Sequence, residues 1–393
     1  MDSNCHVICV CCGQGFPNGM AQASRIRMVG KALVTEGCRF SVFNIGAGPC
    51  PNPASRGTVD GIHFEYLPGP TLRPDGFWKR NWMYARGLLQ ACRRLYALRS
   101  KETNLCVYLY FAGWRFPLFH RFLRAIRLPI IQEVGEWWPG ARERLIRDRS
   151  LRVSQGTLAI SRHVIDRLKA LPSYTRDHRI LHVPILIDTD EWTPRARAHS
   201  APNGDIPYIL WCGNIGLSDE DIQFLLRVTK VVNNSDACRG VLVGRHEDSS
   251  RDRIYELART LGLRMDLLAL PGFVSDDELN GLMSGATALL LPLWETERSI
   301  SRFPTKLAHY LASETPVVTT GVGDLTLYLE DGQSACLVPP GDVKEFAGKV
   351  TFLIRNPARA KMIGREGRLV AMEHFSIKAN RAKLAQFFAE VAR

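Results

Sequence analysis

Short apolar runs rich in β-branched residues alternate along this chain with longer segments of helical periodicity. The first run, residues 6–12, passes through a glycine-rich turn into a predicted helix at 22–36 and a second strand at 40–44. Strand, glycine-rich loop, helix and strand together form one unit of a parallel α/β sheet. The glycines are not spaced as GxGxxG, and no acidic residue closes the second strand, so the turn does not predict a dinucleotide site.

The same alternation runs through the rest of the first half and restarts in the second half. In the first half it predicts strands at 105–110, 129–133 and 156–160 and helices at 114–126 and 162–170, the last capped by Ser161. In the second half it predicts strands at 208–212, 240–244, 267–270, 288–292 and 316–320 and helices at 220–231, 251–261, 276–284 and 306–312.

A polar, proline-bearing stretch between the two halves has the composition of a linker. The pattern therefore predicts two doubly wound α/β domains, at 1–187 and 208–375, joined by a linker at 188–207. A C-terminal helix at 376–393 is expected to cross back to the N-terminal domain. Ligands of such sheets bind outside the carboxyl ends of the strands, which predicts a binding cleft between the domains.

The strongest chemical signal lies in residues 302–324, RFPTKLAHYLASETPVVTTGVGD. A basic loop runs into the helix predicted at 306–312, and the N–H groups at a helix start, with Lys306 in the first turn, attract phosphate. The uncharged strand at 316–320 is typical of a strand buried on both faces of a parallel sheet. An ordinary helix-to-strand connection with a solvated lysine would give the same pattern.

The formal net charge of +12 is unevenly divided. Residues 1–187 hold 27 Lys and Arg against 12 Asp and Glu, and the remainder holds 24 against 27. The densest basic parts, at 76–100 and 114–129, interleave arginine with aromatic residues. In the first of these parts, apolar residues fall at near-helical spacing among arginines: Trp78, Trp82, Leu89, Cys92 and Leu95, with Arg80, Arg86, Arg93 and Arg94.

This arrangement predicts a helix lying on an anionic membrane surface. A nucleic-acid-binding face and an amphipathic helix packed on its own domain are the alternatives. No uncharged apolar run approaches the roughly 20 residues of a membrane span, and the N-terminus lacks the basic region of a signal peptide. Of the 11 cysteines, Cys9, Cys11 and Cys12 fall in an alternating buried strand whose neighbouring side chains face opposite ways, and the others show no paired CxxC spacing. This predicts buried thiols in a reducing cytoplasm.

Ordered segments over nearly the whole chain resemble the GT-B glycosyltransferases. Within that fold they resemble the large retaining family of the group 1 type, glycosyltransferase family four, which includes sucrose synthases. The first half supplies FPNGMAQASRIRMVGKALVTEGCRFSVFN, GTLAISRHVIDRLK and ILHVPILIDTDEWTP, the last with Asp188 at the family's usual aspartate. The second half supplies YILWCGNIG, GVLVGR, LPGFVSDDELNGLMSGATALLLP and FPTKLAHYLASETPVVTT. The resemblance implies two Rossmann-like domains facing across a cleft that binds a nucleotide sugar.

The resemblance also implies roles for single residues. The loop with Gly272, Phe273 and Val274 would contact the base, and the turn with Phe303, Pro304, Thr305 and Lys306 would face the diphosphate. Gly19 would let the first loop approach the sugar and phosphates, since glycine has no Cβ. An ordinary turn glycine is the alternative for Gly19, and a core residue is the alternative for Phe273.

The sequence departs from the family at two places. The family's two glutamates, one near the sugar hydroxyls and one on the ribose, correspond to Ser301 and His309. The family's Arg and Lys after the first strand of the second domain are replaced by a loop with Asn214, followed by acidic residues. We expect Lys306, Arg302, Arg298 and Arg245 to neutralise the diphosphate instead, and His309 to bond the ribose.

Glu133 ends the strand predicted at 129–133, and Glu136 follows it three residues later beside two tryptophans. We expect Glu136 to orient an acceptor or sugar hydroxyl. A carboxylate that only satisfies backbone N–H groups at a helix start is the alternative.

The sequence thus predicts a retaining hexosyltransferase with no cofactor and no metal, since no aspartates have metal-ligand spacing. Its partners would be a nucleotide-sugar donor, a glycan, lipid-linked or small-molecule acceptor, and an anionic membrane at the cytoplasmic face. A catalytically silent GT-B scaffold is the main rival. A nucleic-acid-binding protein is the weaker one.

Overall fold

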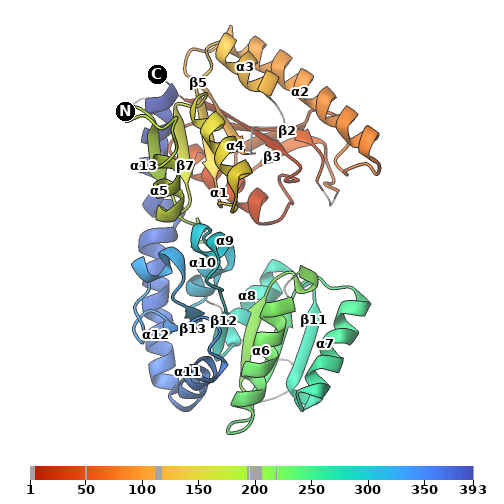
Figure 1. Ribbon diagram of the computed structural model, residues 1–393, viewed down its shortest axis with the longest axis vertical. Coiled ribbons are helices and arrows are strands. Elements are labelled where there is room, and N and C mark those ends of the chain that lie inside the picture. Colours follow the sequence, from red (N-terminus) through yellow and green to blue (C-terminus); the bar gives the residue numbers. More distant parts are fainter. Residues whose placement is uncertain are drawn as a thin grey trace. The chain divides into compact units, whose positions relative to one another are not determined.

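The computed structural model describes residues 5–48, 51–110, 117–192, 194, 206–217 and 219–392. The chain divides into two compact units (Figure 1). The first unit comprises Met1–Leu186, Ser301–Phe303 and Ile377–Arg393, and the second comprises Ile187–Ile300 and Pro304–Ser376. The C-terminal helix is therefore part of the first unit, and so is a three-residue segment from the second half of the sequence.

The first unit is built on one eight-stranded sheet. Its elements are β1 (His6–Cys12), α1 (Ala21–Thr35), β2 (Arg39–Gly46), β3 (Arg56–Val59), β4 (Ile62–Tyr66), α2 (Phe77–Arg99), β5 (Leu105–Tyr110), α3 (Pro117–Ala125), β6 (Ile130–Val134), α4 (Ala141–Leu151), β7 (Gly156–Ala159), α5 (Arg162–Lys169), β8 (Arg179–His182) and α13 (Ile377–Ala392). The strand order is β3-β4-β2-β1-β5-β6-β7-β8, with only the β3–β4 pair antiparallel.

Alternate residues of β1 face two layers of helices. Val7, Cys9 and Cys11 belong to a core shared with α1 and α13, whereas Ile8 and Val10 belong to a core shared with α2 and α3 (Figure 1). Successive side chains of a strand point to opposite faces, so a strand that is apolar at every position is covered on both sides. Cys9 and Cys11 of β1 are accordingly core residues and Cys12 is half-buried, and every cysteine within the described ranges is a free thiol.

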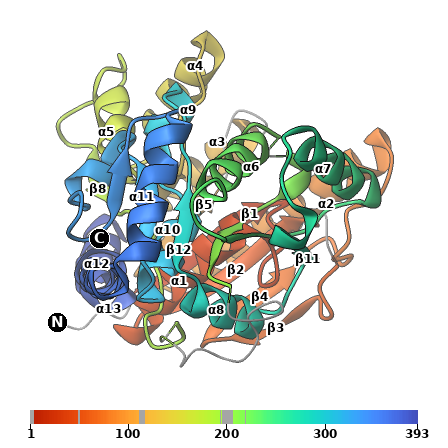
Figure 2. The same ribbon diagram turned by 90° about the horizontal axis from the view of Figure 1, so that it is seen from below.

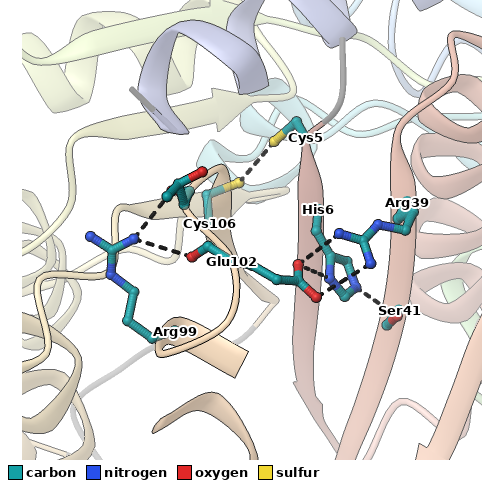
Figure 3. A network of polar contacts seen from close by, with 8 residues as sticks. Cys5, His6, Arg39, Ser41, Arg99, Glu102 and Cys106 are labelled. Atoms are coloured by element: carbon teal, nitrogen blue, oxygen red, sulfur yellow. Dashed lines mark hydrogen bonds and ion pairs between the residues drawn. The ribbon is translucent and has the colours of Figure 1, made fainter. Parts of the chain in front are cut away.

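A polar network closes the amino ends of β1, β2 and β5 (Figure 3). Glu102 accepts a hydrogen bond of 2.8 Å from Arg39 and lies 2.8 Å from Nδ1 of His6, whose Nε2 is 3.0 Å from Oγ of Ser41. Burial lowers the pKa of His6 below its ordinary value. This edge is opposite to the carboxyl ends where parallel sheets bind ligands, so we interpret the network as structural.

The second unit is built on a six-stranded parallel sheet (Figure 2). Its elements are β9 (Tyr208–Cys212), α6 (Asp219–Val232), β10 (Arg239–Val243), α7 (Asp248–Thr260), β11 (Leu268–Gly272), α8 (Asp276–Gly285), β12 (Ala288–Leu291), α9 (Glu297–Ser301), α10 (Thr305–Ala312), β13 (Val317–Thr320), β14 (Cys336–Val338), α11 (Val343–Arg355) and α12 (Pro357–Val370). The order β11-β10-β9-β12-β13-β14 is the doubly wound order of a Rossmann sheet, and it reverses between β9 and β12.

Each predicted strand is present, within a few residues of its expected ends. The sequence interpretation missed the β3–β4 hairpin, β8, β14 and the helices α4, α9, α11 and α12. The predicted helix at 114–126 is observed as α3, and Trp114 lies outside the described residues, as does most of the linker predicted at 188–207. Ser161 caps α5 as predicted, because its side chain accepts a hydrogen bond from the Val164 N–H.

Candidate functional site

In the second unit, polar residues and glycines gather where the strand order reverses. Gly213 and Asn214 follow β9, Arg245 and His246 follow β10, and the first turn of α10 lies at the same carboxyl edge of the sheet. Open α/β sheets bind ligands at this reversal because two neighbouring connections leave the strand ends in opposite directions. The point between β9 and β12 is therefore the candidate site of this unit.

The strand ends approach one another closely at this edge. The Gly213 N–H donates to the Val243 carbonyl at 2.9 Å, and the Gly244 N–H donates to the Gly272 carbonyl at 2.9 Å. A Cβ on Gly244 would fall 1.7 Å from the Gly213 carbonyl oxygen, and the φ angle of Gly244 is +153°. Only glycine fits at position 244, and the loops after β9, β10 and β11 pack tightly against one another at this edge of the sheet.

Lys306, the second residue of α10, lies beside these loops. Its Nζ lies 4.0 Å from the centroid of the Trp211 ring, which is within the range of a cation–π interaction. Trp211 belongs to β9 and its side chain is only 1% exposed. An α-helix leaves the N–H groups of its first turn without internal acceptors, so a cation and backbone donors are present together at the start of α10.

Phe273 forms an exposed aromatic platform after β11. Its side chain is 77% exposed, and the guanidinium carbon of Arg245 lies 5.8 Å from its ring centroid. Phe273 is therefore not a core residue. Within the described ranges, both ring nitrogens of His246 are buried and make no hydrogen bond, and Nε2 lies 3.9 Å from the position of a Cβ on Gly272. Val274 is half-buried beside this platform.

His309 lies one turn after Thr305 on α10. Its Nδ1 is 3.1 Å from the Thr305 carbonyl oxygen, and its ring packs edge-to-face on Trp192 with centroids 4.5 Å apart. Desolvation lowers the pKa of His309 below its ordinary value. The neutral ring is therefore the stable form near pH 7, with Nδ1 donating to the helix carbonyl.

In the first unit, Gly19 lies in a tightly packed turn before α1, and the role that the family resemblance implies for it stays a prediction. A Cβ at this position would fall 1.9 Å from the Gln14 carbonyl oxygen and 2.7 Å from the Cβ of Ala23. The space is filled by atoms of the loop and of the first turn of α1. Packing of this turn against α1 therefore already requires glycine at position 19.

Glu136 follows β6 and accepts a hydrogen bond of 2.9 Å from the indole N–H of Trp138. Glu133, three residues earlier in the chain, is buried in a different network. There Arg25 donates to Oε1 at 3.3 Å and the Tyr108 hydroxyl donates to Oε2. Burial raises the pKa of Glu133 above its ordinary value, although the charge of Arg25 opposes this shift. Arg25 also donates to the carbonyls of Val183 and Pro184, so this network ties helix, strands and the chain after β8 together.

Ser301 has a structural position rather than a ligand-facing one. Its side chain is fully buried, and its Oγ accepts from the Trp137 N–H at 2.9 Å and lies 3.2 Å from the Trp137 carbonyl oxygen. The Ser161 hydroxyl donates to the Ser301 carbonyl at 2.6 Å. The expectation that Ser301 contacts the donor is therefore corrected, because backbone groups of the first unit already occupy its hydroxyl.

The remaining predicted residues fall in both units. Phe303 is buried and Arg302 is half-buried in the segment assigned to the first unit, whereas Pro304 is buried in the second unit, where Thr305 starts α10. Arg298 is exposed on α9. The sequence reasoning did not find Trp211 or Arg25. In the sequence pattern Trp211 looks like any apolar strand residue and Arg25 like any solvent-exposed helix residue. Only their contacts in the structure set them apart from such residues.

Helix α2 carries an exposed ridge of large apolar residues. Its buried line is Met83, Gly87, Ala91 and Leu95, which recur every four residues and pack on the sheet. The ridge comprises four exposed residues spaced by four and seven: Trp78, Trp82, Leu89 and Tyr96. At 3.6 residues per turn, the two lines lie on opposite sides of the helix. The sequence pattern places Cys92 and Leu95 on the same apolar face as Trp78, Trp82 and Leu89. That prediction is wrong for these two residues, because Leu95 is buried and Cys92 is half-buried.

Basic side chains flank the α2 ridge. Lys79, Arg86 and Arg93 are exposed on one side of it, whereas Arg94 lies toward the sheet and pairs with Glu65 at 3.1 Å. Within the described ranges, no helix has the length and apolar character needed to cross a bilayer. Nor does any group of three or more His, Cys, Asp and Glu side chains within those ranges have the arrangement of a metal site.

Comparison with known proteins relates the second half of the chain to one family. Residues 206–356 match the family described as Glycosyl transferases group 1. Over 123 residues the chain is 32% identical to the MMP alpha-(1->4)-mannosyltransferase of Mycolicibacterium hassiacum, covering 31% of this chain and 28% of that protein. Over 187 residues it is 26% identical to the D-inositol 3-phosphate glycosyltransferase of Streptomyces bingchenggensis, covering 48% and 38%. The chain therefore matches well under two thirds of either relative.

Solved structures resemble the chain over its whole length. Sucrose-phosphate synthase from Thermosynechococcus elongatus has a TM-score of 0.77 at 17% identity and covers 99% of both chains. Anabaena Alr3699/HepE in complex with UDP and glucose has a TM-score of 0.70 at 12% identity and covers 98% of this chain and 100% of that chain. At these identities the likeness shows the fold alone. The prediction of a GT-B fold with two Rossmann-like α/β domains is confirmed.

Proposed function

We propose that this GT-B protein is a glycosyltransferase that moves a sugar from a nucleoside-diphosphate sugar to an acceptor. The observation that carries the proposal is the position of Lys306. Its Nζ lies 4.0 Å from the Trp211 ring, at the edge of the sheet where the strand order reverses. An ammonium group beside the N-terminus of a helix is suited to a diphosphate, whose negative charge increases as the sugar leaves.

The comparisons support the same assignment. Lys306, Trp211 and the platform residue Phe273 all lie within residues 206–356, the part that matches the Glycosyl transferases group 1 family. The structurally similar Alr3699/HepE protein was solved with UDP and with UDP-glucose. We infer that the Phe273 platform stacks on the base of the nucleotide and that His246 supplies polar contacts to it, because a flat exposed ring is suited to another flat ring.

The proposed transfer proceeds with retention and without a metal or cofactor. The bond between the anomeric carbon and the diphosphate oxygen breaks, and the acceptor oxygen bonds to the same face of that carbon. The acceptor proton passes to a diphosphate oxygen, so no protein nucleophile is needed. Lys306 stabilises the departing charge with Arg302, Arg298 and Arg245, and Glu136, oriented by Trp138, positions an acceptor or sugar hydroxyl.

The acceptor is a glycan, a lipid-linked glycan or a small molecule, and we propose that the protein meets it at the cytoplasmic face of an anionic membrane. The α2 ridge supports this part of the proposal. Trp78 is 82% exposed and Trp82 is 73% exposed, with Lys79, Arg86 and Arg93 beside them. Aromatic rings that enter the interface and basic residues that attract anionic lipid are the two components of peripheral attachment.

Ligand binding followed by product analysis tests the proposed function. The full-length protein is screened by thermal shift against UDP, GDP and their sugar conjugates. A ligand present at a hundred times its dissociation constant adds about 2.7 kcal/mol of stability. NMR of the product formed from the best donor then gives the anomeric configuration. An inverted anomer would refute retention, and the absence of stabilisation by any nucleotide would refute the proposal as a whole.

A catalytically silent GT-B protein is the second candidate. Its support is the chemistry at two positions, since Ser301 is occupied by the Trp137 backbone and the neutral His309 replaces a carboxylate. Such a protein would bind UDP with the same site and transfer nothing. Nucleotide binding without turnover or donor hydrolysis, across the acceptor classes above, favours this candidate.

A further inference from the structure

In the contact between Lys306 and Trp211, a flexible lysine side chain meets a tryptophan ring that is held in place by core packing. Trp211 belongs to the apolar core of the second unit with Ile209, Leu242 and Leu290. Its ring is therefore held by packing on strand β9. Lysine has a flexible four-carbon side chain, and its ammonium group is directed only by what it contacts.

The loop after β9 leaves room for this contact. A Cβ on Gly213 would fall 2.5 Å from Cη2 of Trp211 and 2.8 Å from Nζ of Lys306. Any side chain at position 213 would displace either the ring or the ammonium group. The indole ring and the ammonium group are therefore both packed close to the backbone of Gly213.

A second contact fixes the helix that carries Lys306. Tyr310 lies one turn later on α10 and is fully buried, and its hydroxyl oxygen accepts from the Cys212 N–H at 2.8 Å. Two successive residues of β9, Trp211 and Cys212, thus contact two side chains of α10 that are four positions apart. These two contacts fix the position of the start of α10 relative to the end of β9.

We propose that Trp211 is a positioning residue that holds the Lys306 ammonium ready for the diphosphate. This inference rests on the proposed function, in which Lys306 meets the leaving group. The face of an indole ring attracts a cation without accepting a directed hydrogen bond from each N–H, so this contact holds the ammonium in place without itself engaging its N–H groups. Preorganised donors stabilise a developing charge more than donors that must first be ordered.

The preorganisation is important in this chain because the loop after β9 offers no cation. Residues 213–217 contain no Lys or Arg, and Asp219, Glu220 and Asp221 follow. A lysine that moved freely would spend much of its time paired elsewhere. The indole ring keeps its charge at the strand end.

Purified full-length variants test the inference by a double-mutant cycle. The variants are Trp211→Leu, Trp211→Phe, Lys306→Met and the double variant Trp211→Leu/Lys306→Met, and kcat/KM for transfer and the Kd for UDP are measured. We expect Trp211→Leu to lower kcat/KM about tenfold in the parent chain and less than about twofold in the Lys306→Met background. Trp211→Phe keeps an aromatic face and should recover most of the loss. Equal losses in both backgrounds would overturn the inference.

A matched core substitution separates positioning from general destabilisation. Phe224 is buried in the same unit and packs on Trp294 and Phe346, with centroids 5.5 and 5.2 Å apart. Phe224→Leu should lower the melting temperature to a similar extent and leave kcat/KM within about twofold. A tenfold loss in Phe224→Leu would assign the Trp211 effect to destabilisation and overturn the positioning role.

The contact can also be measured without any ligand. Melting temperatures of the same four variants in the absence of nucleotide should be non-additive, because Trp211 and Lys306 interact in the folded protein. Additive shifts would overturn the inference even if the protein is an active transferase. If the melting temperatures of the variants are non-additive but the wild-type protein neither binds UDP nor transfers sugar, the proposed function is refuted and the contact is not.

Discussion

At the scale of single residues, the site depends on a few side chains whose neighbours determine what they do. Lys306 is half-buried and contacts a core tryptophan, whereas Ser301 is fully buried against backbone. Both were donor-site candidates on the sequence, and both lie in the same short stretch. The contacts, not the residue types, separate them.

Lys306→Ala should impair transfer much more than it impairs folding. The substitution removes a preorganised cation from the diphosphate, and loss of one such donor costs on the order of a hundredfold in rate. Steady-state kinetics and thermal unfolding of the purified variant check this expectation. Near-normal turnover would remove Lys306 from the site.

His309→Ala should raise the KM for the donor more than it lowers kcat. Nδ1 of His309 is committed to the Thr305 carbonyl at 3.1 Å, so the ribose contact falls to Nε2 of the neutral ring. A contact made equally in the ground state and the transition state affects KM alone. Kinetics at varied donor concentration test this, and a nucleotide complex with the His309 ring turned away from the ribose would contradict it.

Ser301→Ala should act on stability rather than on donor binding. It leaves the buried Trp137 N–H without its acceptor at 2.9 Å, and such an unsatisfied group costs about 1–3 kcal/mol. We expect lower stability in urea unfolding and an unchanged KM for the donor. Ser301→Glu, which restores the family's carboxylate, should destabilise more because it buries a charge. A raised KM in Ser301→Ala with normal stability would restore Ser301 to the donor site.

At the scale of elements, α2 shows how one helix carries two different faces. Its buried line of Met83, Gly87, Ala91 and Leu95 packs on the sheet, and the ridge on the opposite side is apolar as well. A solvated helix normally has polar residues opposite its buried face. The ridge is therefore the part of α2 on which the proposed membrane contact rests.

The paired variant Arg86→Gln/Arg93→Gln should weaken attachment to anionic vesicles. Each basic residue near an anionic surface contributes about 1 kcal/mol, so we expect roughly a tenfold or greater loss in co-sedimentation at low salt. Wild-type protein should also be released as salt rises. Trp78→Ser/Trp82→Ser should weaken binding at every salt concentration, since the aromatic contribution is not electrostatic.

Arg94→Gln is the matched control for the vesicle experiment. Arg94 lies on the same helix but pairs with Glu65 at 3.1 Å, away from the ridge. It should bind vesicles nearly as well as the wild type. Equal recovery of wild-type protein with neutral and anionic vesicles would contradict the electrostatic part. Stronger binding to nucleic acid than to vesicles would assign the basic face to that partner.

At the scale of the whole molecule, buried histidines should make stability depend on pH. Burial lowers the pKa of His6 and of His178, and His178 lies 2.8 Å from Oγ1 of Thr157 and 3.1 Å from the Ser154 carbonyl. The unfolded histidine titrates near 6.5, above the folded value, so the unfolded chain binds more protons in the interval between them. The free energy of unfolding should therefore fall as pH falls below about 6.5.

The variant His178→Gln tests this dependence. It keeps a polar side chain and removes one titrating group, so the slope of unfolding free energy against pH should decrease by up to about 1.4 kcal/mol per pH unit. Urea unfolding at several pH values between 7.5 and 5 gives the slope. Thr157→Val removes the hydrogen-bond partner but not the titration, and it should lower stability at every pH without changing the slope. An unchanged slope in His178→Gln would contradict the assignment.

The sequence by itself determined the fold class and indicated where the candidate site of the second unit lies. Apolar runs of four to eight residues between helical segments predict parallel strands, and a basic turn before residues 306–312 predicts an anion-binding helix start. Both signals are local, because burial on two faces leaves every position of a strand apolar and a helix start exposes N–H groups whatever the rest of the chain does.

Only the tertiary structure decided which residues contact one another. Trp211 and Lys306 are distant in the sequence, and so are Ser301 and Trp137 or Arg25 and Glu133. Which face of α2 is buried was also decided there, because its two lines are both apolar and periodicity cannot distinguish them. Local periodicity fixes how a segment folds, but the packing of segments far apart in the chain fixes the neighbours of each side chain, and those neighbours set its charge, its mobility and its role.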